Sequence, residues 1–277
     1  MPQIELHETL LTEAVPQGQR GLSDNLLEVS NVSLRFGGVD ALTDVSFSIE
    51  RGELFGLIGP NGAGKTSILN CLNGVYKPQK GTILLAGKSL VAMKPHETAE
   101  AGIARTFQNL ALFTNLSVFD NLMLGRHHLM RSGVLSGALW WGPARREEIV
   151  HRRRCAEIIE LLDLGTHRRT PVGLLPYGIQ KRIELGRALA MDPVLLLLDE
   201  PVAGMNNEET EDVAAHILEI RKELGIAMVL VEHHLDFVMD LVDRLMVLAF
   251  GKVIANGLPA EVRNDQRVIE AYLGVQR

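Results

Sequence analysis

The alternation of apolar and polar residues predicts mainly strands in the first third of the chain. Residues 1–25 are polar and unpatterned, so we expect a tail there. From Leu26 the pattern becomes β-like, and Val45–Ile49 alternates with the period of two that is typical of a half-buried strand. Leu54–Ile58 is a continuous apolar run that ends in glycine, which predicts a buried strand. A helix is expected to follow over about 65–73.

Helices dominate the middle of the chain before strands return. Residues from about 96 to 190 have helical character, and Glu147–Leu164 carries apolar side chains at mixed helical spacing. Beyond 190, short apolar strands alternate with helices. This repetition predicts an α/β fold with a mostly parallel sheet and right-handed crossovers. The expected strands are Val194–Leu198, Ala227–Val231 and Leu245–Ala249, and the expected helices are Glu208–Leu224 and Leu235–Val242.

Composition narrows the classes of function. The chain has 277 residues and a formal net charge of −6, which fits one large domain, or a domain with a subdomain, and gives no support to a protein that coats nucleic acid. Cys71 and Cys155 show no CxxC spacing, so neither a disulfide framework nor a zinc module is expected. No stretch approaches the roughly 18 apolar residues that cross a bilayer. Any action at a membrane is expected from its aqueous side, through another protein.

Gly59–Thr66 is the strongest chemical motif. It reads GPNGAGKT, which fits GxxxxGK[ST], and it lies between a predicted buried strand and a predicted helix. Glycines let backbone N–H groups approach phosphate oxygens, and a helix N-terminus adds partial positive charge. Lys65 would supply a full charge to the β- and γ-phosphates, and the Thr66 hydroxyl would ligate Mg²⁺. The motif therefore predicts a nucleoside triphosphate site.

Two carboxylates at another strand end extend this hypothesis. Asp199 and Glu200 follow the apolar run Leu195–Leu198. In phosphate-loop ATPases an Asp at such a strand end helps to hold Mg²⁺, and an adjacent Glu can polarise the attacking water. The alternative is a pair of solvated loop acids. The buried strand and the phosphate loop together favour the catalytic interpretation.

The histidines leave alternatives open. His233 follows the strand predicted at Ala227–Val231, where it is either an ordinary surface residue or a group that reaches the γ-phosphate and positions the water. Spacing alone does not decide between the two. A metal site made of histidines has less support, because no third-ligand spacing accompanies the two pairs at His127-His128 and His233-His234.

These motifs together resemble the ATP-binding subunit of ABC transporters, over about residues 26–275. The resemblance implies a phosphate-loop NTPase core with a mostly parallel sheet, an antiparallel β subdomain and a helical signature subdomain. It places the core at 26–104 and 190–275 and the helical subdomain at about 105–189. Its further marks are Phe36 where an aromatic ring stacks on adenine, a Q-loop at Arg105–Gln108, a signature at Leu175–Gln180, a D-loop at Ala203–Asn206 and a switch histidine at His233.

The same resemblance implies ATP and Mg²⁺ as ligands and assigns roles to residues. Catalysis is expected from Glu200, His233, Gln108 and Lys65, and metal binding from Thr66, Gln108 and Asp199. The nucleotide is expected to contact Phe36, Gly59, Pro60, Asn61, Gly62, Ala63, Gly64, Lys65, Thr66, Ser67, Tyr177 and Gly178.

Finer features resemble the ATPases of branched-chain amino-acid importers. They include Leu-x-Tyr-Gly in the signature, an insertion at 126–146 and the ending Val268–Gly274. That family implies a second ATPase subunit, two membrane permeases and, indirectly, a substrate-binding protein, all working at the cytoplasmic face of the plasma membrane. Related systems carry urea, amides or aromatic acids, so the cargo stays open. Residues about 109–146, with Phe113, Leu116 and Trp140-Trp141, are a candidate permease-docking face, although ordinary subdomain core explains them equally well.

The signature departs from LSGGQ at three positions. Pro176 stands where a serine hydroxyl is expected, Tyr177 replaces the first glycine and Ile179 replaces glutamine. We therefore expect a slow composite site opposite this signature, which a partner subunit would compensate. A nucleotide-binding subunit that does not hydrolyse is the alternative. Soluble ABC proteins that act on ribosomes or in DNA repair usually carry two such domains or a long coiled coil, and this chain shows neither.

Overall fold

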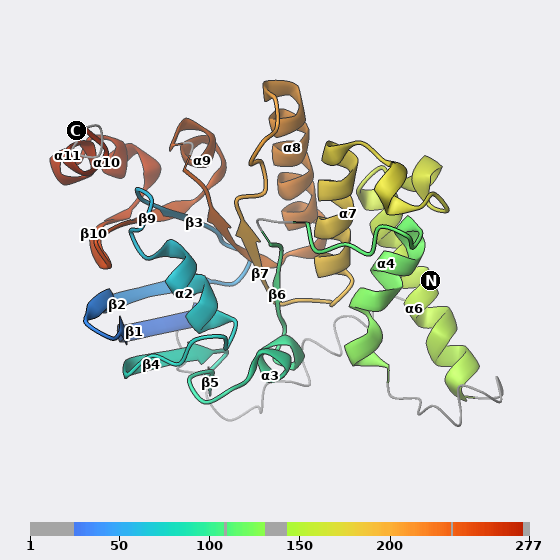
Figure 1. Cartoon of the computed structure of the whole chain (residues 1–277), viewed down its shortest axis with the longest axis horizontal. Helices are drawn as coiled ribbons and strands as arrows, with labels where there is room; N and C mark the ends of the chain where they lie inside the picture. The colour runs from blue at the N-terminus through green and yellow to red at the C-terminus, as the bar shows by residue number, and fades with distance from the viewer. Residues whose placement is uncertain (1–24, 108–109, 131–142, 234, 274–277) are drawn as a thin grey trace.

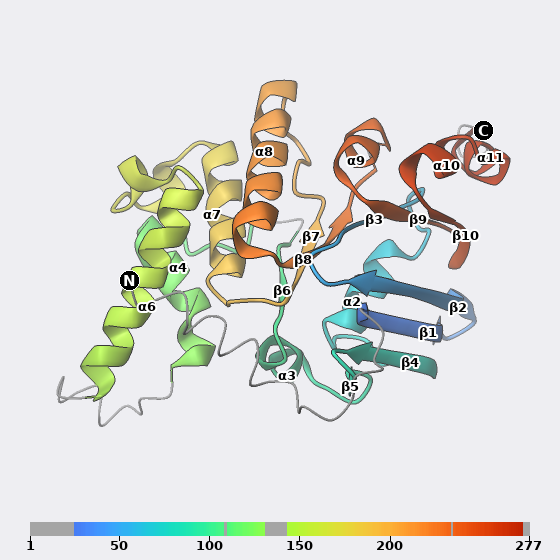
Figure 2. The same cartoon turned by 180° about the vertical axis from the view of Figure 1, so that it is seen from behind.

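A computed structural model describes residues 25–107, 110–130, 143–233 and 235–273, which contain two β-sheets (Figures 1 and 2). The smaller sheet is antiparallel, with the strand order β2-β1-β4-β5. Its two long strands pair through residues such as Val29 and Phe47, whose side chains are both buried. The strands are β1 (Asn25–Phe36), β2 (Val39–Glu50), β4 (Lys80–Leu85) and β5 (Lys88–Ser89).

The larger sheet positions the functional motifs. Its strand order is β10-β9-β3-β8-β7-β6, and every neighbouring pair is parallel except β10 with β9. Because the strands are parallel, the segments that follow β3, β7 and β8 leave the same edge of the sheet. The strands are β3 (Leu54–Ile58), β6 (Ile103–Arg105), β7 (Leu195–Asp199), β8 (Ala227–Val231), β9 (Arg244–Ala249) and β10 (Lys252–Gly257).

Helices lie around this sheet, and one group forms a separate helical part. Both views place α4, α6 and α7 on the opposite side of the larger sheet from the antiparallel sheet (Figures 1 and 2). The α-helices are α2 (Lys65–Leu72), α3 (Pro95–Glu100), α4 (Val118–Gly125), α6 (Pro143–Leu161), α7 (Tyr177–Leu189), α8 (Asn207–Leu224), α9 (Leu235–Leu241), α10 (Pro259–Arg263) and α11 (Gln266–Leu273), and short 3₁₀ helices span His127–Leu129, Gly165–His167 and Val172–Leu174.

Two hydrophobic cores cover the two faces of the larger sheet. Leu195 and Leu197 of β7 belong to the core shared with α2 and the antiparallel sheet. Leu196 and Leu198 belong to the core shared with the helical part and α8. Successive strand residues point to opposite faces, so a strand covered on both sides needs an unbroken apolar run. This explains why β3, β7 and β8 lack polar positions in their interiors.

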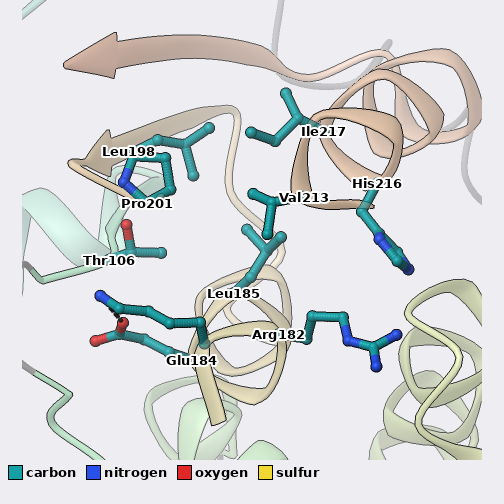
Figure 3. Close-up of a pocket in the computed structure, with 10 residues that line it drawn as sticks. Thr106, Arg182, Glu184, Leu185, Leu198, Pro201, Val213, His216 and Ile217 are labelled. Atoms are coloured by element: carbon teal, nitrogen blue, oxygen red, sulfur yellow. Dashed lines mark hydrogen bonds and ion pairs between the residues drawn. The ribbon is translucent and has the colours of Figure 1, made fainter. Parts of the chain in front are cut away.

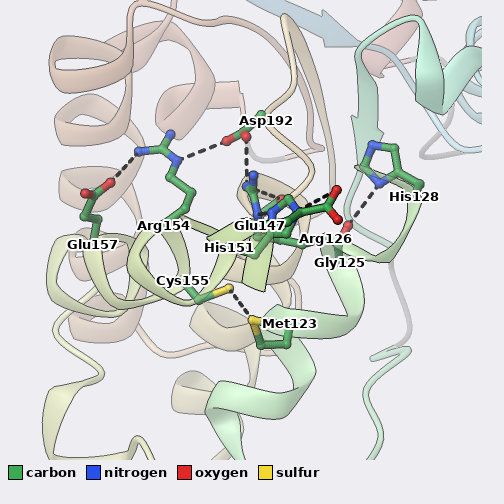
Figure 4. Close-up of polar contacts among 11 residues, drawn as sticks. Met123, Gly125, Arg126, His128, Glu147, His151, Arg154, Cys155, Glu157 and Asp192 are labelled. Atoms are coloured by element: carbon green, nitrogen blue, oxygen red, sulfur yellow. Dashed lines mark hydrogen bonds and ion pairs between the residues drawn. The ribbon is translucent and has the colours of Figure 1, made fainter. Parts of the chain in front are cut away.

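A polar network, in which Arg126 and His151 are buried, joins the helices of the helical part (Figure 4). Arg126, after α4, donates from Nε to His151 Nδ1 on α6 at 2.7 Å and from Nη1 to the Ala190 carbonyl oxygen at 3.0 Å. Asp192 pairs with Arg126 at 2.8 Å and with Arg154 at 3.0 Å. Burial, and then the charge of Arg126, lower the pKa of His151. The network therefore requires a neutral imidazole that accepts a hydrogen bond from Arg126.

Most predicted elements are confirmed. The strands at Leu54–Ile58 and Ala227–Val231 agree at both ends. However, β6 is a strand inside the stretch predicted to be helical, and β10 was not predicted. Both cysteines are free and buried, and burial raises the pKa of the Cys71 thiol to about 12. Among the described residues, no helix is long and apolar enough to cross a membrane. The domain boundaries near 105 and 189 stay predictions.

Candidate functional site

The phosphate loop follows β3 and is shaped by three glycines. Gly59, Gly62 and Gly64 have φ of +149°, +77° and +107°, in the region that side chains rarely allow. A Cβ atom on Gly59 would lie 2.2 Å from the Leu248 carbonyl oxygen, and one on Gly64 would lie 2.8 Å from the Ala41 carbonyl oxygen. At Gly59 and Gly64, backbone atoms of β9 and β2 therefore leave no space for a side chain.

The turn between β9 and β10 also supports the loop. The Gly251 amide donates to the Ala63 carbonyl oxygen at 2.9 Å, and the Gly251 carbonyl oxygen accepts from the Thr43 amide at 2.8 Å. Phe250, in the same turn, has a φ of +48° and an exposed ring. The phosphate loop thus rests against residues that come almost 200 positions later in the chain.

Lys65 lies under this loop with its ammonium group inside the bend. Its Nζ donates to the carbonyl oxygens of Gly59 at 2.6 Å and Pro60 at 3.2 Å. The side chain is buried, and this burial lowers the pKa of Lys65. Three carboxylates act in the opposite direction through their charge, those of Glu200, Asp199 and Glu232. The fold therefore brings the phosphate-loop lysine close to acids from two other strand ends.

The N-terminus of α2 has the features of an anion-binding helix end. Its N-cap is Gly64, no side chain caps it, and its first turn contains no acidic residue. Thr66 is exposed and Ser67 is partly exposed in this first turn. Helix N-termini of this kind bind phosphate through N–H groups and the helix dipole. Of the loop residues, Asn61 and Gly62 are also exposed, while Pro60 and Gly64 are partly exposed and Ala63 is buried.

Asp199 ends β7 and is almost completely buried. Its Oδ2 atom pairs with Arg105 Nη2 at 2.7 Å, and its amide donates to Thr106 Oγ1 at 3.3 Å. Glu200 follows with a φ of +49°, and its amide donates to the Val231 carbonyl oxygen at 2.9 Å. A left-handed backbone at a non-glycine residue is strained, and such strain clusters at functional sites. The sheet edge thus holds the two acids in different environments.

His233 follows β8 beside a fully buried acid. The side chain of His233 is 45% exposed, and its Nδ1 lies 3.6 Å from Glu232 Oε2. Glu232 also accepts from the Val202 amide at 3.1 Å. Burial raises the pKa of Glu232, and the Val202 and His233 amides oppose this shift. No three His, Cys, Asp or Glu side chains gather into a metal cluster in the described part of the chain, which does not include His234.

Phe36 and the signature residues lie outside the cluster around Lys65. The Phe36 ring is 46% exposed and meets the Tyr76 ring edge-on, with centroids 5.0 Å apart. Pro176 is the N-cap of α7, and the Tyr177 hydroxyl faces the Ala203 carbonyl oxygen at 3.3 Å. A Cβ atom on Gly178 would lie 3.1 Å from Glu209. Both views show α7 well away from α2 (Figures 1 and 2). Gln108, His234 and Trp140-Trp141 lie outside the described residues.

A mostly apolar pocket separates α7 from α8 and the end of β7 (Figure 3). Thr106, Leu198 and Pro201 line one side of it, and Val213 and Ile217 of α8 line another. None of its lining residues belongs to the predicted site. The signature helix therefore packs on the larger sheet around this pocket.

Comparison with known proteins identifies this arrangement. Residues 42–203 match the family described as ABC transporter, and residues 252–277 match the family described as branched-chain amino acid ATP-binding cassette transporter. The high-affinity branched-chain amino acid transport ATP-binding protein LivG of Escherichia coli (strain K12) is 39% identical over 253 residues, which cover 91% of this chain and 99% of LivG. The chain belongs to the ABC transporter ATP-binding subunits. Within that family it is of the LivG and BraF type.

Further relatives agree with this assignment. BraF of Pseudomonas aeruginosa is also described as a high-affinity branched-chain amino acid transport ATP-binding protein. It is 37% identical to this ABC subunit, and the aligned residues make up 91% of this chain and 99% of BraF. A crystal structure of the ATP-binding cassette MJ1267 in its ADP conformation superposes with a TM-score of 0.79, at 31% identity, over 91% of this chain and 100% of that one. The predicted fold of the ABC cassette is thereby confirmed.

Sequence reasoning gave no role to two residues of this ABC cassette. Arg105 pairs with Asp199 although the two lie 94 positions apart. Glu232 is fully buried, and its charge acts on Lys65. From the sequence, Glu232 was only an acidic residue that follows a predicted strand. The available signal was a charged residue at the carboxyl end of a parallel strand, where ligands of α/β sheets bind. That signal applied to both Arg105 and Glu232.

Proposed function

We propose that this ABC subunit hydrolyses ATP at the phosphate loop and thereby powers the import of branched-chain amino acids. The observation that carries the proposal is the buried Lys65 ammonium group inside the glycine loop, on which the charges of Asp199 and Glu200 act. The C-terminal match at 252–277 supports the branched-chain cargo. The names of LivG and BraF point the same way. We place the subunit at the cytoplasmic face of the membrane, next to its permeases.

The residues present fit a magnesium nucleotide. The uncapped amides of α2 and the buried Lys65 suit a triphosphate. Mg²⁺ is usually held by one or two carboxylates together with substrate phosphates. The Asp199 carboxylate and the Thr66 hydroxyl would therefore be sufficient as protein ligands. Gln108 would add an amide oxygen. A bound Mg²⁺ would neutralise charge that develops on the phosphates. We assign the adenine to the exposed face of Phe36.

Two side chains have the chemistry that hydrolysis requires. Glu200 would act as the base that orients the attacking water, because it follows the buried strand that also carries Asp199. His233 would donate to the γ-phosphate from its exposed position after β8. Lys65 would stabilise charge on the transferred group. Glu200 and His233 follow the neighbouring strands β7 and β8, and Lys65 begins the helix that follows β3 and the phosphate loop.

A second ATPase subunit would complete the site. Tyr177 and Gly178 lie at the N-terminus of α7, which packs away from the phosphate loop of its own chain. We propose that these residues face the γ-phosphate bound to the partner subunit, where the N-terminus of α7 would add a second positive dipole end. Two permeases, and indirectly a substrate-binding protein, are the further proposed partners. We propose the described apolar side chains Phe113 and Leu116, both exposed, as part of the permease contact.

The Lys65→Ala substitution tests the nucleotide site. We expect Mg·ATP and ADP to bind at least tenfold more weakly to this variant, because a charge-assisted bond to phosphate contributes about 1.5–3 kcal/mol. Isothermal titration of the full-length chain measures the change. Lys222→Ala removes an exposed lysine from the last turn of α8 and should bind as the parent does. Equal affinity in Lys65→Ala and the parent would refute the proposed site.

Pro176 supports a slow composite site. Proline caps α7 here without a side-chain hydrogen bond, and it has neither a hydroxyl nor an amide hydrogen for phosphate. We expect Pro176→Ser to raise the ATPase rate of the assembled importer about tenfold, since a hydroxyl bonded to phosphate stabilises the transition state by about 1.5–3 kcal/mol. Steady-state hydrolysis at saturating Mg·ATP measures this. An unchanged rate would end the idea that Pro176 slows the site.

A further inference from the structure

Arg105 occupies an unusual position for a cation. It ends β6, and its side chain is 6% exposed while that of its partner Asp199 is 10% exposed. Its Nη2 lies 2.7 Å from Asp199 Oδ2, and its Nη1 donates to Asn70 Oδ1 on α2 at 2.6 Å. Its Nε is buried without a hydrogen-bond partner among the described residues. The guanidinium therefore joins the end of β7 to the helix that begins at the phosphate loop.

The pairing is built into the sheet. In the β6–β7 register Arg105 lies opposite Leu197, two residues before Asp199. The side chain thus reaches along the edge of the sheet to the carboxylate. A planar guanidinium with several donors can hold one carboxylate oxygen and the Asn70 amide oxygen at once, which the single ammonium of lysine cannot do in the same geometry. Asp199 is the acid that we propose to bind Mg²⁺, so Arg105 fixes the orientation of that carboxylate.

The two residues after Arg105 continue the connection to the signature helix. Thr106 Oγ1 accepts from the Asp199 amide at 3.3 Å. The Phe107 amide donates to Glu184 Oε1 at 3.3 Å, and the Phe107 carbonyl oxygen accepts from Lys181 Nζ at 3.3 Å. Both Glu184 and Lys181 are on α7 and are buried. The segment Arg105–Phe107 is therefore bonded to Asp199 at one end and to the signature helix at the other.

We propose that Arg105 is a positioning residue that holds Asp199 by one oxygen and couples this carboxylate to the signature helix. This inference rests on the proposed function, because it assigns the metal to Asp199. Arg105 acts in two opposite ways. Its charge weakens the attraction of Asp199 for a divalent cation, and its fixed geometry keeps the second carboxylate oxygen directed at the nucleotide site.

Removing the charge of Arg105 should therefore strengthen Mg²⁺ binding but lower the rate of ATP hydrolysis. In full-length Arg105→Met, we expect the Mg²⁺ concentration that half-saturates ADP binding to fall at least threefold. At saturating Mg·ATP, kcat should fall at least tenfold while KM changes less than threefold. A merely structural defect would weaken metal binding and turnover together. Fluorescence titration with an ADP analogue across Mg²⁺ concentrations gives the first value, and steady-state hydrolysis gives the others.

Two further variants make the test decisive. Arg105→Lys keeps the positive charge but lacks the planar guanidinium with its several donors. Its Mg²⁺ dependence should therefore match that of the parent, while its kcat should be at least threefold lower than the parental kcat. Arg244→Met removes another arginine–carboxylate pair, with Glu53 at the opposite end of β3, and should leave both values unchanged. Parental Mg²⁺ dependence in Arg105→Met would overturn the inference. If Arg105→Met does not fold, parental kcat in Arg105→Lys would overturn it. Equal nucleotide affinity in Lys65→Ala and the parent would instead refute the proposed function.

Discussion

Glu200→Gln should lower the ATPase rate of this subunit about a hundredfold or more while Mg·ATP stays bound. Glutamine keeps the size of the side chain and the backbone turn at φ +49°, but it cannot accept the proton of the attacking water. General-base catalysis of this kind contributes roughly 10²–10⁴-fold. Because binding is retained and hydrolysis is blocked, ATP should hold two subunits together. Hydrolysis assays and size-exclusion chromatography with Mg·ATP measure the two effects.

The control for this experiment is Glu223→Gln, which changes an exposed acid in the last turn of α8. It should hydrolyse ATP at the parental rate and show no dimer that persists with ATP. A parental rate in Glu200→Gln would mean that another group activates the water. Equally low rates in the parent and in Glu200→Gln, without an ATP-bound dimer that only the variant retains, would support instead a subunit that binds nucleotide without hydrolysing it.

Lys181→Met should destabilise the fold by about 3–5 kcal/mol, because it leaves a buried carboxylate without its counter-ion. Lys181 Nζ lies 3.4 Å from Glu184 Oε2, and the two side chains are 4% and 2% exposed. Burial raises the pKa of Glu184, while Lys181 and the amides of Phe107 and Ala111 oppose this shift. Urea unfolding of the full-length variant, followed by circular dichroism, measures the loss.

Removing the second charge should restore much of the stability. Lys181→Met/Glu184→Gln keeps an acceptor for the Phe107 amide and leaves no buried charge, so we expect it within about 1.5 kcal/mol of the parent. Because the folded-state pKa of Glu184 is above its ordinary value of 4.5, the neutral acid is favoured in the folded protein, and stability from this group is lost as pH rises. The deficit of Lys181→Met should therefore shrink as pH falls toward 4.5. A double variant as unstable as the single one would contradict this account.

The fold could be predicted wherever local pattern and final environment agree. The run Leu195–Leu198 indicated a buried strand, and β7 is indeed covered on both faces. β6 escaped prediction because it has three residues and forms only by pairing with β7, some 90 positions away. β10 follows a turn at Phe250 and lies at the sheet edge, where half-exposed residues give little apolar signal.

The candidate site divides in the same way. The phosphate loop is contiguous, and its glycine spacing describes a backbone shape, so Gly59–Thr66 could be recognised from residue order alone. The pairing of Arg105 with Asp199 depends on strand register, which residue order does not specify. The burial of Glu232 depends on the approach of the loop after β7, through the Val202 amide. Long-range geometry of this kind becomes visible only in the folded chain.

The backbone contacts that surround the phosphate loop have a consequence for biosynthesis. The backbone atoms next to the phosphate loop belong to Ala41 on the N-terminal side and to Leu248 and Gly251 on the C-terminal side. A growing polypeptide therefore has the GPNGAGKT segment long before it has the hairpin that shapes it. The contacts of Leu248 and Gly251 with the loop therefore form only after residue 251 has left the ribosome.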